Sequence, residues 1–227
     1  MMRRTSTTIL RAGLAGLALL ALPHTQVQAQ SVELLVKHLS VSTGADGVKR
    51  STEFSERLTR AQNAVWLSRV LPPAAHSDHD HAKGGNEHKH LDTATAPRWI
   101  SRAANGDLTL KLAPRGERML VNVTPVDYGN VGFDGSWAAA WSLMDPAVLK
   151  RMKTVKTSGD LTTYTLTEKG RNLKVIWNAK LQIPERVESS DANSRNETLV
   201  QVLGTPKLLP WEKLQGFMQK DYSDYLD

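Results

Sequence analysis

Five of the seven histidines in this 227-residue chain lie within fifteen residues, and acidic side chains stand between them. Neutral imidazole nitrogens bind Zn²⁺ and Cu²⁺, and neighbouring carboxylates supply further oxygen ligands. The sequence therefore predicts a zinc or copper site in this segment. Its candidate ligands are His76, Asp78, His79, Asp80, His81, Glu87, His88 and His90.

The spacing of these histidines also favours metal binding. His79 and His81 form one His-x-His pair, and His88 and His90 form a second pair beyond two glycines. In an extended segment, side chains two residues apart point to the same side, so each pair can offer two nitrogens to one ion. Four nitrogens would complete a tetrahedral zinc site or a tetragonal copper site. The alternative is a solvated polar insertion that holds no ligand.

The segment around the cluster, residues 73–97, is rich in His, Asp, Ala, Gly and Lys, and Leu91 is its one large aliphatic residue. Such a composition buries too little apolar surface to offset the entropy of ordering the chain. We therefore expect a mobile loop. Because no neighbouring residues promise a rigid shell around the ion, metal binding here would serve buffering or delivery rather than catalysis.

The beginning of the chain has the three parts of a secretory signal in order. Met1–Arg4 is basic, Ala12–Leu22 is apolar, and Val27–Ala29 offers small residues to a signal peptidase. The apolar run is much shorter than the roughly 20 residues of a membrane-spanning helix, and no later stretch of the sequence is apolar enough to span. We expect a cleavable signal at residues 1–29 and one periplasmic domain at residues 30–227, the alternative being an uncleaved anchor.

Composition and missing motifs exclude several classes of protein. The chain has no cysteine, which excludes a disulfide scaffold, cysteine-ligated zinc, iron–sulfur clusters and thiol catalysis. A net charge of +6, partly carried by the leader, is too small to indicate a nucleic-acid partner. The chain lacks the nucleotide-binding, serine-hydrolase and zinc-protease motifs, and His38 is interpreted as a structural residue. We therefore expect a protein that is not an enzyme.

Alternating apolar residues between turn signals predict a mostly antiparallel sheet. Asn105-Gly106 is the strongest of these turn signals and predicts a two-residue hairpin. The stretch 48–58 is interpreted as an exposed or edge strand, because charged residues interrupt its apolar face. The other predicted strands are residues 63–71, 99–104, 108–112, 119–124, 162–167, 172–177, 183–190 and 198–203.

Other stretches have helical spacing. Residues 31–39 fit a short amphipathic helix, with a strand as the alternative. In Ser136–Met144, two tryptophans and a methionine share one helix face, and Asp145-Pro146 then starts a further turn. Pro210 begins a predicted C-terminal helix whose inner side would carry Leu214, Phe217 and Met218.

Four aromatic residues around the central helix form a second candidate site. They are Tyr128, Phe133, Trp137 and Trp141. Together they could line a cavity for an acyl chain or another hydrophobic ligand. The alternative is ordinary core packing, which is the more common role of an aromatic stripe at helical spacing.

The predicted fold class is α+β: a curved, mostly antiparallel sheet, or half-barrel, with helices packed on its concave face. The stretches 158–169, 172–177, 182–189 and 198–203 follow one another as charged hairpin, strand, Ile-Pro-Glu-Arg-Val-Glu strand and crossing strand. In this order the chain resembles the periplasmic outer-membrane lipoprotein-carrier (LolA-like) superfamily. The resemblance implies a half-barrel that binds lipidated cargo in its concave face.

The leading interpretation is an exported, non-enzymatic binding or carrier protein whose histidine-rich loop holds zinc or copper. One alternative is a carrier or chaperone for lipoprotein or another hydrophobic ligand, with the loop as an unstructured insertion. Another is a factor that delivers metal to a periplasmic metalloenzyme.

Deletion of residues 76–90 is expected to abolish binding of Zn²⁺ or Cu²⁺, because the deletion removes all the candidate ligands. Titration calorimetry on the intact and deleted proteins measures this directly. Acidification to about pH 5 should release the metal from the intact protein, because the imidazoles become protonated. Equal metal uptake by the deleted protein would rule out this site.

Overall fold

The computed structural model describes residues 31–72 and 91–226. The predicted signal peptide and every predicted metal ligand lie outside these residues. Residues 91–97, at the end of the predicted loop, form a hydrogen-bonded turn in which Asp92 accepts from the backbone N–H of Ala94 and Thr95. In this turn Ala96 is buried, and Leu91 packs against the core.

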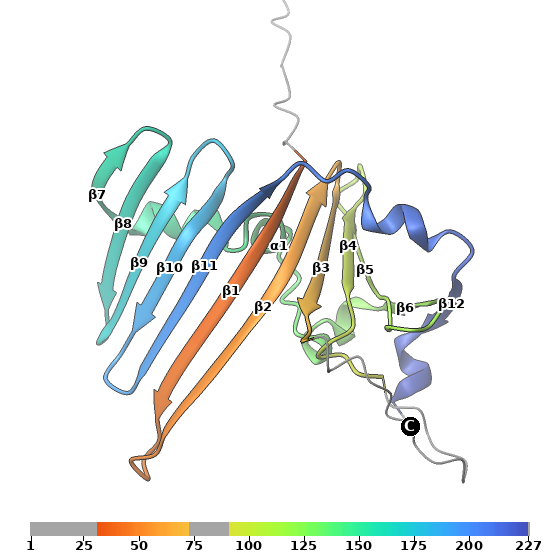
Figure 1. Ribbon diagram of the computed structural model, residues 1–227, viewed down its shortest axis with the longest axis horizontal. Coiled ribbons are helices and arrows are strands. Elements are labelled where there is room, and N and C mark those ends of the chain that lie inside the picture. Colours follow the sequence, from red (N-terminus) through yellow and green to blue (C-terminus); the bar gives the residue numbers. More distant parts are fainter. Residues whose placement is uncertain (1–30, 73–90, 227) are drawn as a thin grey trace, which may run out of the picture.

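The described residues form one 12-stranded sheet, with the order β12-β6-β5-β4-β3-β2-β1-β11-β10-β9-β8-β7. Neighbouring strands are antiparallel except β12 and β6, which are parallel. The sheet is strongly curved (Figure 1). The strands are β1 (Val32–Thr43), β2 (Lys49–Ala61), β3 (Ala64–Val70), β4 (Arg98–Arg102), β5 (Leu108–Leu112), β6 (Met119–Val123), β7 (Lys153–Ser158), β8 (Leu161–Glu168), β9 (Arg171–Asn178), β10 (Ile183–Ser190), β11 (Ser194–Gly204) and β12 (Met218–Asp221).

The helix predicted at residues 31–39 is wrong and the alternative, a strand, is confirmed, because β1 begins at Val32. Val32, Leu34 and Val36 are buried while the residues between them are more exposed, which is the two-residue period of a strand. β1 pairs along its length with both β2 and β11, and these ladders satisfy its backbone. Residues 48–58 were predicted as an exposed or edge strand. The strand is not at an edge, since β2 lies between β1 and β3, but its first five residues are exposed.

The hairpin predicted at Asn105-Gly106 is confirmed, but its loop is longer than the predicted two residues. Arg102 pairs with Leu108 and the backbone N–H of Ala103 donates to the carbonyl of Asp107, so the loop consists of the three residues 104–106. Gly106 has a positive φ of 94°, and β4 and β5 pair antiparallel on either side of the turn. The predicted strands at residues 162–167, 172–177, 183–190 and 198–203 are confirmed as parts of β8 to β11. β7 and β12 were not predicted. All their residues are exposed, so neither strand has an apolar pattern that the sequence could reveal.

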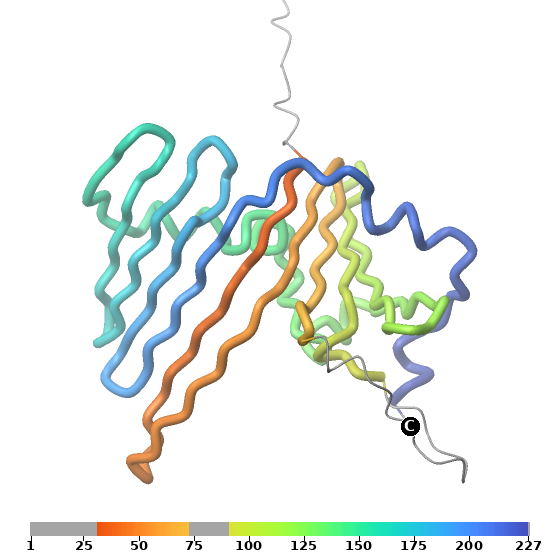
Figure 2. The backbone as a smooth tube through the Cα atoms, viewed as in Figure 1, coloured from red at the N-terminus to blue at the C-terminus, as the bar shows by residue number. Residues whose placement is uncertain are grey.

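Residues 124–152, here named the crossing segment, connect β6 near one end of the sheet to β7 at the other. The segment runs behind the sheet in the view of Figure 1, and the backbone tube of Figure 2 shows the same path. It contains η2 (Pro125–Asp127), η3 (Gly129–Val131), α1 (Trp137–Ser142) and η4 (Pro146–Arg151). The crossing segment therefore covers part of one face of the sheet. We name this face the inner face and refer to the crossing segment over it as the roof.

The predicted α+β class is only partly correct, because the described residues form an almost entirely β structure. α1 is the one α-helix in the described residues, and it spans six residues. It ends where Leu143 adopts a left-handed conformation with φ of 63°. The turn at Pro146 and the predicted C-terminal helix are 3₁₀ segments, the latter being η5 (Pro210–Leu214), followed after β12 by η6 (Tyr222–Tyr225). Met218, predicted on a buried helix face, lies exposed in β12.

Three apolar clusters lie between the crossing segment and the inner face. The first lies on β4 to β6 and includes Phe133. The second lies on β1 to β3, where Trp137 and Trp141 pack against it. The third lies on β9, where Met152 at the end of the crossing segment joins Val175 and Trp177. The roof is therefore held across the sheet by apolar burial, which is the dominant favourable contribution to folding.

Arg60 is the one arginine among the largest fully buried side chains, with 2% of its surface exposed. Its guanidinium donates hydrogen bonds to the carbonyl of Trp141 at the end of α1 and to the carbonyl of Leu181 in the β9–β10 turn. It also lies 5.0 Å from the centre of the Trp141 ring. Burial lowers the pKa of Arg60 to about 10, so the side chain is still charged at neutral pH.

Arg60→Leu is expected to destabilise the protein by about 2–4 kcal/mol, since it removes two hydrogen bonds from a buried charged group and leaves two partly buried carbonyls without these donors. Chemical denaturation measures this loss. Arg57→Leu is the matched control, because Arg57 lies on the same strand but pairs with Glu33 at 3.1 Å and is half exposed. The control should lose no more than about 1 kcal/mol. Equal losses in the two variants would contradict the role given to Arg60.

Candidate functional site

The four aromatic residues predicted to line a cavity all lie on the crossing segment. Tyr128 and Phe133 are buried, with ring centres 4.9 Å apart, and the Tyr128 hydroxyl donates to the carbonyl of Leu108. Burial raises the pKa of Tyr128. These contacts place Tyr128 and Phe133 in the first apolar cluster, where they act as core residues.

Trp137 and Trp141 form a second aromatic pair, with ring centres 5.2 Å apart. The Ser136 hydroxyl begins their helix by accepting from the backbone N–H of Ala139 at 3.1 Å. Trp137 contacts both the first and the second apolar cluster, so it links the two halves of the core. The structure thus places the predicted aromatic residues on one segment as two pairs, with the tryptophans only partly buried.

Burial on the inner face decreases along the strands, away from the crossing segment. On β1, Val36 is 1% exposed, whereas the next inner-face side chain, His38, is 29% exposed. The open part of the face contains two rows of side chains that are neighbours in the strand register. We name these rows the inner shelf: Phe54, His38, Thr198 and Val187, then Ser40, Asn196, Ser189, Leu173 and Leu166.

His38 has contacts on three sides. Its Nε2 lies 3.3 Å from Oε2 of Glu56, and its Nδ1 lies 3.2 Å from the Thr198 hydroxyl. Its ring stacks on Phe54 with centres 4.6 Å apart. On the far side of Phe54, the Arg69 guanidinium carbon lies 3.6 Å from the ring centre.

The interpretation of His38 as a residue of a helix concealed this arrangement. A signal was present, because the turn at residues 43–47 is recognisable in the sequence. Folding the chain back about Asp46 places residue 38 opposite residue 54, as the register shows. Recognition of a long hairpin would therefore have placed His38 beside Phe54.

A cavity of 410 Å³ lies on the inner face at the β8–β9 hairpin. Its floor is formed by Leu166 and Leu173, which are paired in the register and pack against the third cluster. Charged side chains border it, and one of them, Glu168, pairs with Arg151 of the crossing segment at 2.7 Å. The remaining bordering residues are Lys169 and Arg171. The site offers an apolar floor with polar groups at its edge.

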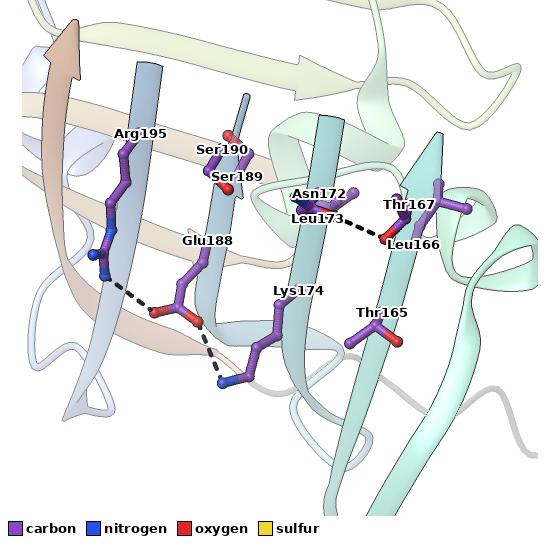
Figure 3. Close-up of a pocket in the computed structure, with 10 residues that line it drawn as sticks. All are labelled: Thr165, Leu166, Thr167, Asn172, Leu173, Lys174, Glu188, Ser189, Ser190 and Arg195. Atoms are coloured by element: carbon purple, nitrogen blue, oxygen red, sulfur yellow. Dashed lines mark hydrogen bonds and ion pairs between the residues drawn. The ribbon is translucent and has the colours of Figure 1, made fainter. Parts of the chain in front are cut away.

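A second hollow, of 340 Å³, lies beside this cavity near the ends of β8 to β11 and shares Leu166 and Leu173 with it (Figure 3). Many of its polar side chains come from the outer face and are paired with one another. Glu188 lies 3.3 Å from Lys174 and 3.8 Å from Arg195. Because these charges already have partners, this hollow offers fewer free groups to a ligand than the inner face does.

Within residues 31–72 and 91–226, no three His, Asp or Glu side chains gather as metal ligands would. The predicted metal ligands fall within residues 73–90, so the metal site stays a prediction from the sequence. The same described ranges contain no helix that is both long and apolar enough to span a membrane.

No family model and no curated protein matches this sequence. Among solved structures, the chain is similar to a LolA superfamily protein from Nitrosomonas europaea, with 8% identity, a TM-score of 0.36 and coverage of 80% of this chain and 88% of that one. It is also similar to an outer membrane lipoprotein-sorting protein domain from Vibrio parahaemolyticus, with 10% identity, a TM-score of 0.35 and coverage of 81% and 89%.

A DUF1329 family protein from Desulfovibrio piger is similar at 8% identity and a TM-score of 0.36, with coverage of 82% of this chain and 92% of that one. The superfamily that the sequence resembles is thus found among the structural neighbours.

Proposed function

We propose that this protein is an exported, non-enzymatic carrier or chaperone that holds an apolar chain, such as an acyl group of a lipid or lipoprotein, on its inner face. The observation that carries the proposal is the partial roof over that face. The crossing segment covers one part and leaves beside it a shelf that ends at an apolar cavity of 410 Å³. Ligand sites are commonly concave, largely apolar and of this size.

The floor of the cavity is continuous with the apolar core. Leu166 and Leu173 contact the third cluster, and so do Met144, Val148 and Leu149 of the crossing segment. A chain that enters at the β8–β9 hairpin would therefore meet apolar side chains from both the sheet and the roof. Each buried methylene group would contribute about 0.8 kcal/mol to binding before the cost of immobilising the ligand.

The proposal assigns the protein to the periplasm, on the basis of the leader at residues 1–29. Metal binding by the histidine-rich segment is a separate proposal with separate residues. A carrier that uses the inner face does not need those histidines, so the two activities can be tested independently.

Protein purified from the periplasm without an affinity tag is expected to contain acyl lipid, which mass spectrometry of an organic extract detects. Elemental analysis of the same sample reports zinc and copper. Lipid without metal would support the carrier function alone, and metal without lipid would contradict the use of the inner face.

Leu173→Gln is expected to weaken binding of a fluorescent acyl probe at least about tenfold, since it replaces part of the apolar floor by an amide. Leu199→Gln is the matched control, because Leu199 lies on the adjoining part of the sheet but is 42% exposed and belongs to the outer face. Thermal unfolding verifies that both variants are folded. Equal affinity in the two variants would contradict binding over Leu173.

A further inference from the structure

Three side chains from three adjacent strands form a continuous stack at one end of the inner shelf. The Arg69 guanidinium of β3 lies 3.6 Å from the centre of the Phe54 ring of β2. The opposite neighbour of Phe54 is His38 of β1, whose ring centre lies 4.6 Å away. A guanidinium this close to a ring centre is held against the face of the ring, and its N–H groups can still donate to another partner.

The N–H groups of Arg69 are without an acceptor in the described part of the chain. Glu56 is its cross-strand neighbour in the register, but the Glu56 carboxylate lies 3.3 Å from His38 instead. The backbone carbonyl of Arg69 is occupied, because Arg115 donates a hydrogen bond to it. Arg69 therefore presents a planar cation, oriented by Phe54 and half-buried, with its hydrogen-bonding capacity unused.

The arginines of the outer face behave differently. Arg57 pairs with Glu33 at 3.1 Å, and Arg186 pairs with Glu197 at 2.6 Å. If Arg69 served only to pack against Phe54, an apolar side chain would suffice. Its hydrogen-bond donors, which have no acceptor in the described residues, therefore suggest a ligand. A group with five donors in a fixed fork matches a carboxylate or a phosphate, which accept two parallel hydrogen bonds.

We infer that Arg69, held by Phe54, binds the anionic headgroup of an amphiphile, a carboxylate or a phosphate, whose apolar chain lies along the inner shelf. This inference rests on the proposed carrier function and names its class of ligand. The shelf leads from Phe54 on β2 to Leu173 on β9, which is four strand spacings or about 19 Å along the sheet. The headgroup site and the apolar cavity thus lie at the two ends of one surface.

Binding of oleate and of monoolein to the wild-type protein and to Arg69→Gln tests the inference. The two probes share an acyl chain, but only oleate is charged. Wild type is expected to bind oleate at least about tenfold more tightly than monoolein, and the substitution should remove this preference, as loss of a charge-assisted hydrogen-bond pair would. Monoolein affinity should not change. Lysophosphatidic acid, tested in parallel, distinguishes a phosphate headgroup from a carboxylate.

Arg57→Gln is the matched control, since it removes the same charge from the outer face of β2 and should leave every affinity unchanged. Arg69→Lys keeps the charge without the planar fork and should retain only part of the preference. Thermal unfolding verifies the fold of each variant. An unchanged preference in Arg69→Gln would overturn the inference and leave the carrier function intact. Failure of wild type to bind any of the three probes would overturn both.

Discussion

The buried guanidinium of Arg60 is the constraint that fixes the crossing segment on the sheet. It connects β2 to the end of α1 through the Trp141 carbonyl and to the β9–β10 turn through the Leu181 carbonyl. Carbonyl dipoles and the Trp141 ring, rather than a carboxylate, compensate this charge, and α1 ends with its partial negative charge directed toward it. Apolar packing alone is non-directional, so these two hydrogen bonds determine where along the strands the roof lies.

The position of the roof divides each central strand into two chemically different halves. On β1, Val32, Leu34 and Val36 lie beneath the crossing segment, and His38 and Ser40 lie beyond it. A longer or shifted roof would bury His38 and Glu56 and impose the cost of desolvating them. The inner shelf therefore stays uncovered, because the strands of the sheet extend beyond the region that the crossing segment covers.

The sequence permits prediction of elements whose signals are local. The Asn105-Gly106 turn and the alternation in residues 172–177 depend on neighbours in the chain, and both predictions are confirmed. Residues 31–39 carry apolar side chains at spacings that suit either a helix or a strand, and pairing with β11, more than 150 residues away, decides between them. Arg60 and Arg69 have no distinguishing sequence context, so their burial and stacking follow only from tertiary contacts.

One cation of the inner face, Arg69, differs from the paired charges of the outer face, and this difference indicates the side that meets a ligand. On the outer face, Glu188 and Glu197 are surrounded by Lys174, Arg186 and Arg195 in a closed set of ion pairs. On the inner face, Arg69 has an aromatic ring for a neighbour and no acceptor in the described residues. A network whose members already pair with one another gains little from an added anion. An oriented guanidinium gains hydrogen bonds from such an anion, and the shelf beside it, which is polar in the middle and apolar at Leu166 and Leu173, adds buried area at its far end.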